Sequence, residues 1–296
     1  MASPVSARDH LILQVVVLVW SLTAILGQII SLPSQTVVVW RTAIAAVTLG
    51  AWLAARGGLC RFGIWERRAL LNGCLIGFHW YLFFLASRLG NVSVALTGVA
   101  TLSLWITLLE PLLVRNRSWR ASECLLALGV AAGVALVAGS DRVVIPCLLT
   151  GIAAAAAAAV FSIFNARIVQ HLPAVAMSFY EMVSASLFTL LLSLLTLRPF
   201  DAAQWLPQPA DWAPLLTLAL LCTVFAFSAC VWLQRRVPPF TIGIAGNLEP
   251  VYGMILAALV FGSSEVMGPR FYAGAAIIIG CVILHTLPAR GSRETP

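Results

Sequence analysis

The chain has 296 residues, of which 61% are hydrophobic and only 10% are charged, and its formal net charge is +7. About 25% of the residues of a soluble globular domain are charged, so this composition excludes one. The seven cysteines are scattered without a CxxC or CxxH spacing, which predicts neither a disulfide framework nor a zinc site. The ATP-binding pattern GxxxxGK(S/T) does not occur, so the sequence gives no sign of ATP hydrolysis.

Apolar segments long enough to cross a bilayer recur along the whole chain. A transmembrane helix needs about 20 apolar residues, each of which adds 1.5 Å to its length. Because little of the chain is left over for a domain outside the bilayer, the sequence predicts an all-α membrane protein with ten transmembrane helices. We expect these helices near residues 10–30, 34–55, 68–88, 92–114, 121–139, 146–168, 173–197, 212–234, 238–262 and 269–287.

The arginines predict how the chain is oriented in the membrane. Cytoplasmic loops carry an excess of basic residues, and most arginines fall on one side if the N-terminus is inside. The sequence therefore predicts a multi-pass protein of the cytoplasmic (inner) membrane with both termini in the cytoplasm. The positive charge reports topology, so the expected partner is the lipid bilayer, and no nucleic acid is expected. The outer loops would hold only Arg88, Arg142, Arg198 and Arg270.

Polar side chains lie on single faces of the first three segments. Ser21 follows Trp20 in the first segment, Arg41 lies in the second, and His79 and Tyr81 lie in the third. Ionisable residues inside a membrane are costly and by default mark a functional site. Alternatively, each of them has a purely structural role, in which its side chain makes a hydrogen bond that holds two helices together.

The pattern of the first half returns in the second half. A shift of 140 residues places Arg41 on Glu181, and a shift of 147 residues places Trp80 on Phe227. Five spans in each half make the second half enter the membrane from the opposite side. This inverted-topology architecture is typical of secondary transporters, which place one site at the repeat interface. The predicted repeats are residues 1–140 and 141–296.

The ninth segment carries the group of residues that most strongly indicates a binding site. Glu249 would lie near the middle of the bilayer, where a carboxylate costs roughly 2.5–3.5 kcal/mol unless it has a partner or a wet cavity. Pro250 cannot donate a backbone hydrogen bond, which leaves the carbonyl of Gly246 free. With Asn247 and Gly253, these residues give the helix one small, polar and locally unwound face.

Two stretches resemble a known family. They are HWYLFFLASRLGNVSVA, from His79 to Ala95, and NLEPVYGMILAALVFGSSE, from Asn247 to Glu265. With Trp20-Ser21 and Trp40-Arg41, they make the chain similar to the ten-helix EamA family of the drug/metabolite transporter superfamily. The resemblance covers nearly all of the chain. It implies a central cavity between two five-helix halves and the export or import of amino acids and other small metabolites.

The sequence leaves two roles open for most of the candidate residues. Glu249 binds a substrate amine or takes up a proton, or it fixes helix packing. Arg41 and Glu181 form a structural ion pair, or Arg41 holds a substrate carboxylate. His79 is a proton relay, an aromatic wall or a packing residue. The residues expected to bind substrate are Glu249, Asn247, His79, Arg41, Trp20, Ser21, Tyr81 and Tyr252, and those expected at the unwound segment are Gly246, Pro250 and Gly253.

The function that the sequence favours is secondary active transport of small polar metabolites, amino acids or related compounds, in the export direction and driven by protons. The substrate would pass by alternating access, in which the two halves move relative to each other. The alternatives are a membrane-embedded enzyme acting on lipid or isoprenoid substrates, and a membrane scaffold or sensor. No catalytic set, cofactor or metal site is predicted, and a monomer and a homodimer are both compatible with the sequence.

Overall fold

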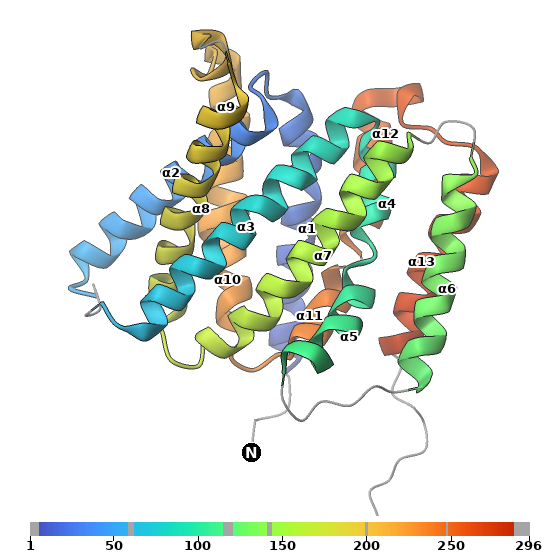
Figure 1. Ribbon diagram of the computed structural model, residues 1–296, viewed down its shortest axis with the longest axis horizontal. Helices are drawn as coiled ribbons and strands as arrows, with labels where there is room; N and C mark the ends of the chain where they lie inside the picture. Colours follow the sequence, from blue (N-terminus) through green and yellow to red (C-terminus); the bar gives the residue numbers. More distant parts are fainter. Residues whose placement is uncertain are drawn as a thin grey trace, which may run out of the picture.

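The computed structural model describes residues 6–58, 62–114, 121–140, 144–198, 201–246 and 248–286. Within these ranges all of the regular structure is helical, and seven segments are long and apolar enough to cross a membrane. Three shorter apolar helices lie where the remaining spans were predicted. The predicted all-α membrane fold is therefore confirmed (Figure 1).

The described residues of the first half of the chain form five helical segments, the fourth of which is broken. Asn91 begins this fourth segment, since its side chain accepts a hydrogen bond from the Val94 amide at 2.9 Å. The helices are α1 (Ala7–Ile29), α2 (Ser34–Ala55), α3 (Ile64–Leu89), the broken pair α4 (Val92–Val99) and α5 (Leu102–Leu113), and α6 (Ala121–Ala138).

Where the structure describes it, the second half forms five segments in the same order, and again the fourth is broken. Its third segment includes a π-helix, η3, whose backbone hydrogen bonds span one residue more than those of an α-helix. The elements are α7 (Ile145–Ile168), α8 (Ala174–Thr196), the short turns η1 (Ala202–Gln204) and η2 (Pro209–Asp211), α9 (Trp212–Leu216), η3 (Thr217–Phe225), α10 (Ala226–Leu233), α11 (Pro239–Gly246), α12 (Glu249–Phe261), η4 (Gly262–Ser264) and α13 (Pro269–Thr286).

The helix bounds repeat with the same two shifts that the sequence predicts. A shift of 140 places the start of α2 on the start of α8. A shift of 147 places the start of α4 on that of α11, and the start of α5 on that of α12. The break in the fourth segment thus recurs at the equivalent point of the ninth. This agreement supports our proposal of two repeats, residues 1–140 and 141–296.

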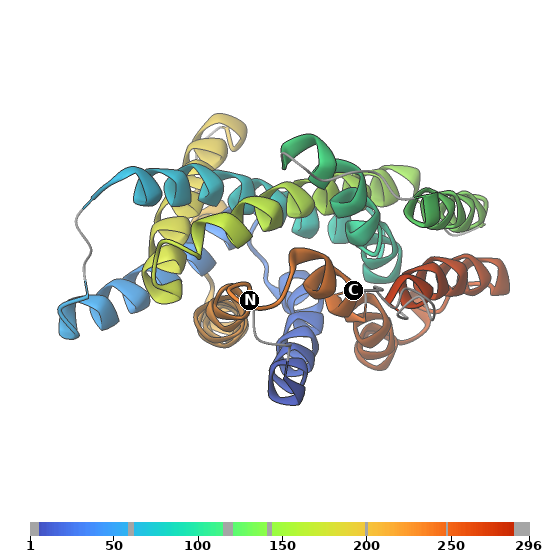
Figure 2. The same ribbon diagram turned by 90° about the horizontal axis from the view of Figure 1, so that it is seen from below.

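The helices form two layers that mix both halves of the chain. Helices α3, α4, α5 and α7 pack together, and α1 packs against α10 and α12. Figure 2 shows these two groups as an upper and a lower row, with the α6–α13 pair at one end. The first helix of each half therefore lies in the layer built mainly by the other half. The space between the layers is where a central cavity can form.

Helices α6 and α13 meet through glycines. A Cβ atom on Gly133 would lie 2.9 Å from the Gly274 carbonyl oxygen, and a Cβ atom on Gly274 would lie 2.7 Å from the Gly133 carbonyl oxygen. The backbones approach this closely because neither residue has a side chain, as expected for the small residues at helix contacts in membranes. Gly280, also on α13, has no such neighbour within 4 Å.

We expect Gly274→Ala and Gly280→Ala to shift stability in opposite directions. Gly274→Ala should destabilise the protein by roughly 1–3 kcal/mol, because its methyl group overpacks the contact with α6. Gly280→Ala should be neutral or stabilise it by up to about 1 kcal/mol, because alanine is the better helix former. Thermal unfolding in detergent measures both. Equal shifts in the two variants would contradict the close α6–α13 contact.

Candidate functional site

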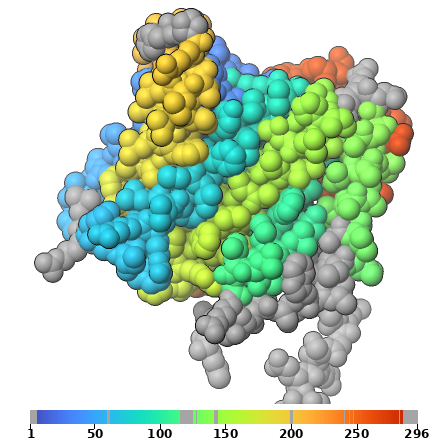
Figure 3. All heavy atoms as spheres, viewed as in Figure 1, coloured from blue at the N-terminus to red at the C-terminus, as the bar shows by residue number. Residues whose placement is uncertain are grey.

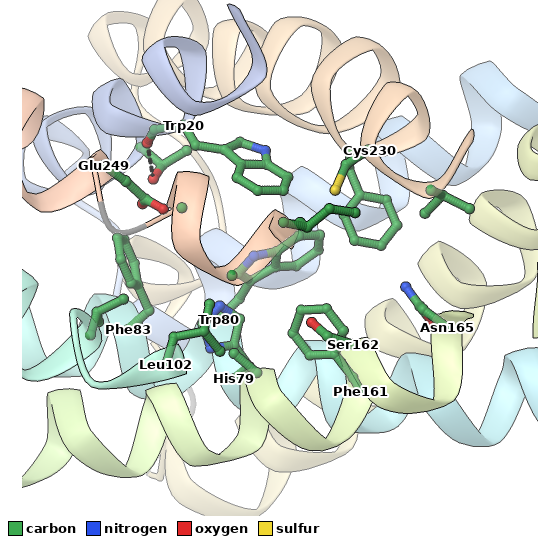
Figure 4. Close-up of a pocket in the computed structure, with 18 of the residues that line it drawn as sticks. Trp20, His79, Trp80, Phe83, Leu102, Phe161, Ser162, Asn165, Cys230 and Glu249 are labelled. Atoms are coloured by element: carbon green, nitrogen blue, oxygen red, sulfur yellow. Dashed lines mark hydrogen bonds between the residues drawn. The ribbon is translucent and has the colours of Figure 1, made fainter. Parts of the chain in front are cut away.

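A cavity of about 80 Å³ lies between the two layers, at the level where both broken helices are interrupted. Val99 and Leu102 reach it from the break between α4 and α5, and Gly246 and Glu249 reach it from the break between α11 and α12. The 147-residue shift relates these two pairs. The other lining residues are Trp20, Thr23, Arg41, His79, Trp80, Phe83, Ala158, Phe161, Ser162, Asn165, Phe227, Cys230, Val231, Gln234, Ile242 and Gly243 (Figure 4).

Arg41 enters the cavity from α2 and is only 1% exposed. Its Nε donates a hydrogen bond to Oγ1 of Thr223, in the π-helix, at 2.7 Å. The guanidinium carbon lies 4.0 Å from the centre of the Trp80 ring, a cation–π contact. These contacts fix the direction of the guanidinium group and occupy only part of its donors.

Glu249 enters the cavity at the first residue of α12. The positive end of the helix dipole favours a carboxylate at this place, and proline suits the next position because its missing N–H would be unpaired there anyway. Glu249 and Arg41 are close enough to attract each other electrostatically. The structure nevertheless shows no ion pair between these two described residues. The cavity thus holds a basic and an acidic side chain that do not contact each other directly.

His79, on α3, lines the cavity and is held in place by α7, which lies in the same layer. Its Nδ1 lies 2.8 Å from the carbonyl oxygen of Ala154 on α7. A carbonyl oxygen only accepts, so Nδ1 carries the hydrogen and Nε2 is the acceptor in the neutral ring. The ring also lies 5.5 Å from that of Phe161. His79 therefore both packs α3 against α7 and presents an imidazole to the cavity.

Aromatic rings form much of the remaining wall. Trp80 and Phe227, which the 147-residue shift relates, meet edge to face with their centres 5.6 Å apart. Trp20 lies near Glu249 in Figure 4, while Phe161 lies on the side of α7. The Trp20 indole Nε1 donates to the Cys222 carbonyl oxygen at 3.3 Å. The wall is thus apolar and aromatic, with a few polar groups fixed within it, as in most small-molecule sites.

Three lining residues carry buried polar atoms without a hydrogen-bond partner in the described part of the chain. They are Nη1 of Arg41, Nδ2 of Asn165 and Oε1 of Gln234. Most buried polar side-chain atoms in folded proteins are paired, so each exception needs a reason. A polar ligand or water in the cavity would supply partners for two donors and one acceptor. The arrangement can therefore bind a small molecule with polar groups of both kinds.

The structure separates the predicted site residues into two groups. Trp20, Arg41, His79, Gly246 and Glu249 line the cavity, and Ser21, Tyr81 and Tyr252 do not. The Ser21 hydroxyl donates instead to the Leu18 carbonyl oxygen of its own helix at 2.6 Å. Tyr252 packs against the apolar cluster of α1 and α10. Asn247 lies outside the described residues.

The unwound segment of the ninth span is shorter than the sequence predicts. Gly246 ends α11, and Pro250 lies in the first turn of α12, so the two flank the break. Gly253 lies inside the regular part of α12, where it packs against Leu96. The interruption is therefore confined to the junction between the two helices.

The ion pair between Arg41 and Glu181, one of the two predicted alternatives, is not formed. Glu181 is fully buried, and its Oε1 accepts a hydrogen bond from Nδ2 of Asn72 at 3.1 Å. The same Asn72 amide group contacts Oδ1 of Asn165. Repeat equivalence places Arg41 and Glu181 at matching points of α2 and α8, but each side chain finds its partner elsewhere.

Several cavity residues are not among the site residues that the sequence predicts. Trp80 could have been found, because it adjoins His79 and is repeat-equivalent to the aromatic Phe227. Gln234 lies near the end of its segment and gave no signal. Thr223 holds Arg41 from η3, a π-helix in which the Thr223 hydroxyl donates to the Leu218 carbonyl oxygen five residues earlier. No pattern of side chains predicted that geometry.

Comparisons with known proteins agree with this architecture. A solved crystal structure has the same fold, with a TM-score of 0.71 and 19% sequence identity over 96% of this chain and 99% of that one. At this identity the likeness shows the fold alone. Among curated proteins, none matches the chain. Residues 145–287 match the model of the EamA-like transporter family. This match, which lies in the second half of the chain, supports membership of the EamA family of the drug/metabolite transporter superfamily.

Proposed function

We propose that the chain is a secondary active transporter of small zwitterionic metabolites, amino acids or related compounds, in the cytoplasmic membrane. It works by alternating access, exports its substrate in exchange for protons, and has both termini in the cytoplasm. The observation that carries this proposal is the presence of Arg41 and Glu249 in one cavity without a direct ion pair. A zwitterion offers a carboxylate to the first and an amine to the second.

The remaining donors of Arg41 suit the carboxylate. Its Nε is used by Thr223, while Nη1 is buried and unpartnered among the described residues. Hydrogen bonds between charged groups are about twice as strong as neutral ones, and a guanidinium group matches the geometry of a carboxylate. Asn165 and Gln234 provide a further donor and acceptor. The aromatic rings offer an apolar surface to the rest of the molecule.

The cavity must widen to take a substrate. Its volume of about 80 Å³ is below the roughly 300–1,000 Å³ of most ligand pockets, and it holds only a few waters. We infer that the moving bodies are the two layers, each of which contains helices from both halves of the chain. Separation of α1, α10, α11 and α12 from α3, α4, α5 and α7 would open the cavity on one side.

A thermal-stability screen tests the substrate class. Purified protein should be stabilised by a zwitterionic amino acid, because a ligand that binds only the folded state stabilises that state. The matching amine without a carboxylate, and the N-acetylated acid without a positive amine, should each stabilise it less. Stabilisation by uncharged sugars alone, or by the single-charge analogues as well as by the zwitterion, would refute the proposal. Counterflow of the selected compound into proteoliposomes then measures transport.

A further inference from the structure

A second cavity lies on the outer surface, away from the central one. It occupies about 420 Å³ where α3 begins and α7 ends, and this volume is within the range of small-molecule sites. Figure 3 shows the two helices side by side across this face of the molecule. The lining residues are Trp65, Arg68, Leu71, Asn72, Leu75, Phe164, Arg167 and Ile168.

The end of this cavity near the helix termini is positively charged. Arg68 and Arg167 line it from α3 and α7, both side chains are exposed, and neither lies within 4 Å of a carboxylate of the described residues. The one acidic residue of α3, Glu66, is used elsewhere, since its Oε2 accepts a hydrogen bond from the Gly63 amide at 2.8 Å. Helix α7 contains no acidic residue. An anion between the two arginines would meet no opposing charge from either helix.

Aromatic contacts hold Arg68 in place. Its guanidinium carbon lies 4.4 Å from the Trp65 ring centre. The same tryptophan stacks on the His171 ring with centres 3.6 Å apart, and Nδ1 of His171 lies 3.1 Å from the Arg167 carbonyl oxygen. Tryptophans of this kind are enriched where a transmembrane helix passes the lipid headgroups. The cluster therefore presents positive charge at a defined position near the membrane surface.

The other end of the cavity is apolar and lies at the outer surface of the molecule. Leu71 is 72% exposed, and Leu75 continues the same surface one turn further along α3. From Trp65 to Leu75 the cavity follows α3 for about 15 Å, at 1.5 Å per residue. Positive charge at the headgroup level and exposed leucine below it match the two parts of an acidic phospholipid. Basic pockets between transmembrane helices on the cytoplasmic side favour such headgroups.

We propose that this cavity between α3 and α7 is a binding site for an anionic phospholipid. The phosphate lies between Arg68 and Arg167, and an acyl chain lies along Leu71 and Leu75. Asn72 forms the inner end of the site and also contacts Asn165, which lines the central cavity. The hydrogen-bonded pair Asn72–Asn165 would therefore separate the lipid from the proposed transport site. Binding of the lipid does not depend on the proposed transport function.

Native mass spectrometry of the purified protein with added phosphatidylglycerol or phosphatidylcholine tests the proposal. The wild-type protein should retain phosphatidylglycerol at least about fivefold more strongly, because each arginine near the surface attracts an acidic lipid. The variant R68Q/R167Q should lose this preference. The matched control R8Q/R56Q removes the same charge from exposed arginines outside the cavity; Arg56 likewise lies over a tryptophan, 4.6 Å from the Trp52 ring centre. It should retain the preference.

Inorganic phosphate distinguishes a lipid site from a simple anion site. It should not displace phosphatidylglycerol, since it lacks the acyl chains that contact the leucines. Displacement by phosphate would overturn the proposal, as would unchanged lipid preference in R68Q/R167Q or an equal loss in R8Q/R56Q. Thermal unfolding of each variant shows that it is folded, which is expected because the substituted side chains are exposed.

Discussion

Glu249→Gln is expected to reduce substrate flux in proteoliposomes by about 10- to 100-fold. A hydrogen bond to a charged group contributes about 1.5–3 kcal/mol, and 1.4 kcal/mol corresponds to a factor of ten in binding. The amide keeps the shape of the side chain at the start of α12 but loses the charge that faces the substrate amine. It also cannot take up a proton, so a pH gradient should no longer change the remaining flux.

The matched control for this variant is Glu181→Gln. Glu181 is a fully buried acid, whereas Glu249 is half-buried; Glu181 does not line the central cavity, and its Oε1 accepts from Asn72. A glutamine oxygen accepts the same hydrogen bond, so we expect near-normal flux with an intact pH response. If Glu249→Gln transports normally while Glu181→Gln does not, the roles proposed here for the two carboxylates are reversed.

Arg41→Gln is expected to abolish stabilisation by zwitterionic substrates and to reduce transport by at least about tenfold. Arg41→Lys should keep part of the transport with a raised KM. Its single ammonium group keeps the charge but cannot both replace the bond to Thr223 and present a forked pair of donors to a carboxylate. Flux assays at varied substrate concentration separate the two effects.

Thr223→Val separates the position of Arg41 from its charge. This variant removes the partner of Nε, together with the hydroxyl's own bond to the Leu218 carbonyl oxygen, but leaves the charge of Arg41 in place, so it should raise KM less than Arg41→Gln does. Because Arg41 is buried, thermal unfolding must first show that each variant is folded. A folded Arg41→Gln protein that still transports an amino acid normally would show that the arginine is structural.

The sequence was sufficient to predict the helices but not all of their breaks. The length of each apolar segment determines where a span can begin and end, which is why the predicted bounds agree with the structure to within a few residues. Pro250 indicated the break before α12. The equivalent break between α4 and α5 contains no proline. There the Thr101 hydroxyl donates to the Gly98 carbonyl oxygen at 2.7 Å, a local bond that competes with the helical pattern.

The direction of individual side chains was the part that the sequence could not predict. Repeat equivalence brings two residues into contact only where both lie near the axis that relates the repeats, as Trp80 and Phe227 do. Arg41 and Glu181 are equivalent too, yet they bind Thr223 and Asn72. Ser21 and Tyr252 do not line the cavity. Packing between the layers determines how α1 and α12 are rotated about their axes, and the residue pattern within one helix does not predict this rotation.

If the transport site lies between the two layers, water and small polar molecules must reach the cavity there. Cys230 lines this cavity, whereas Cys147 is buried in a packed cluster and does not line it. Single-cysteine variants that keep one or the other thiol should be reconstituted in liposomes and treated with a small charged thiol reagent. We expect Cys230 to react at least about tenfold faster than Cys147, since a charged reagent needs an aqueous route. Equal, negligible reaction at both positions would contradict it.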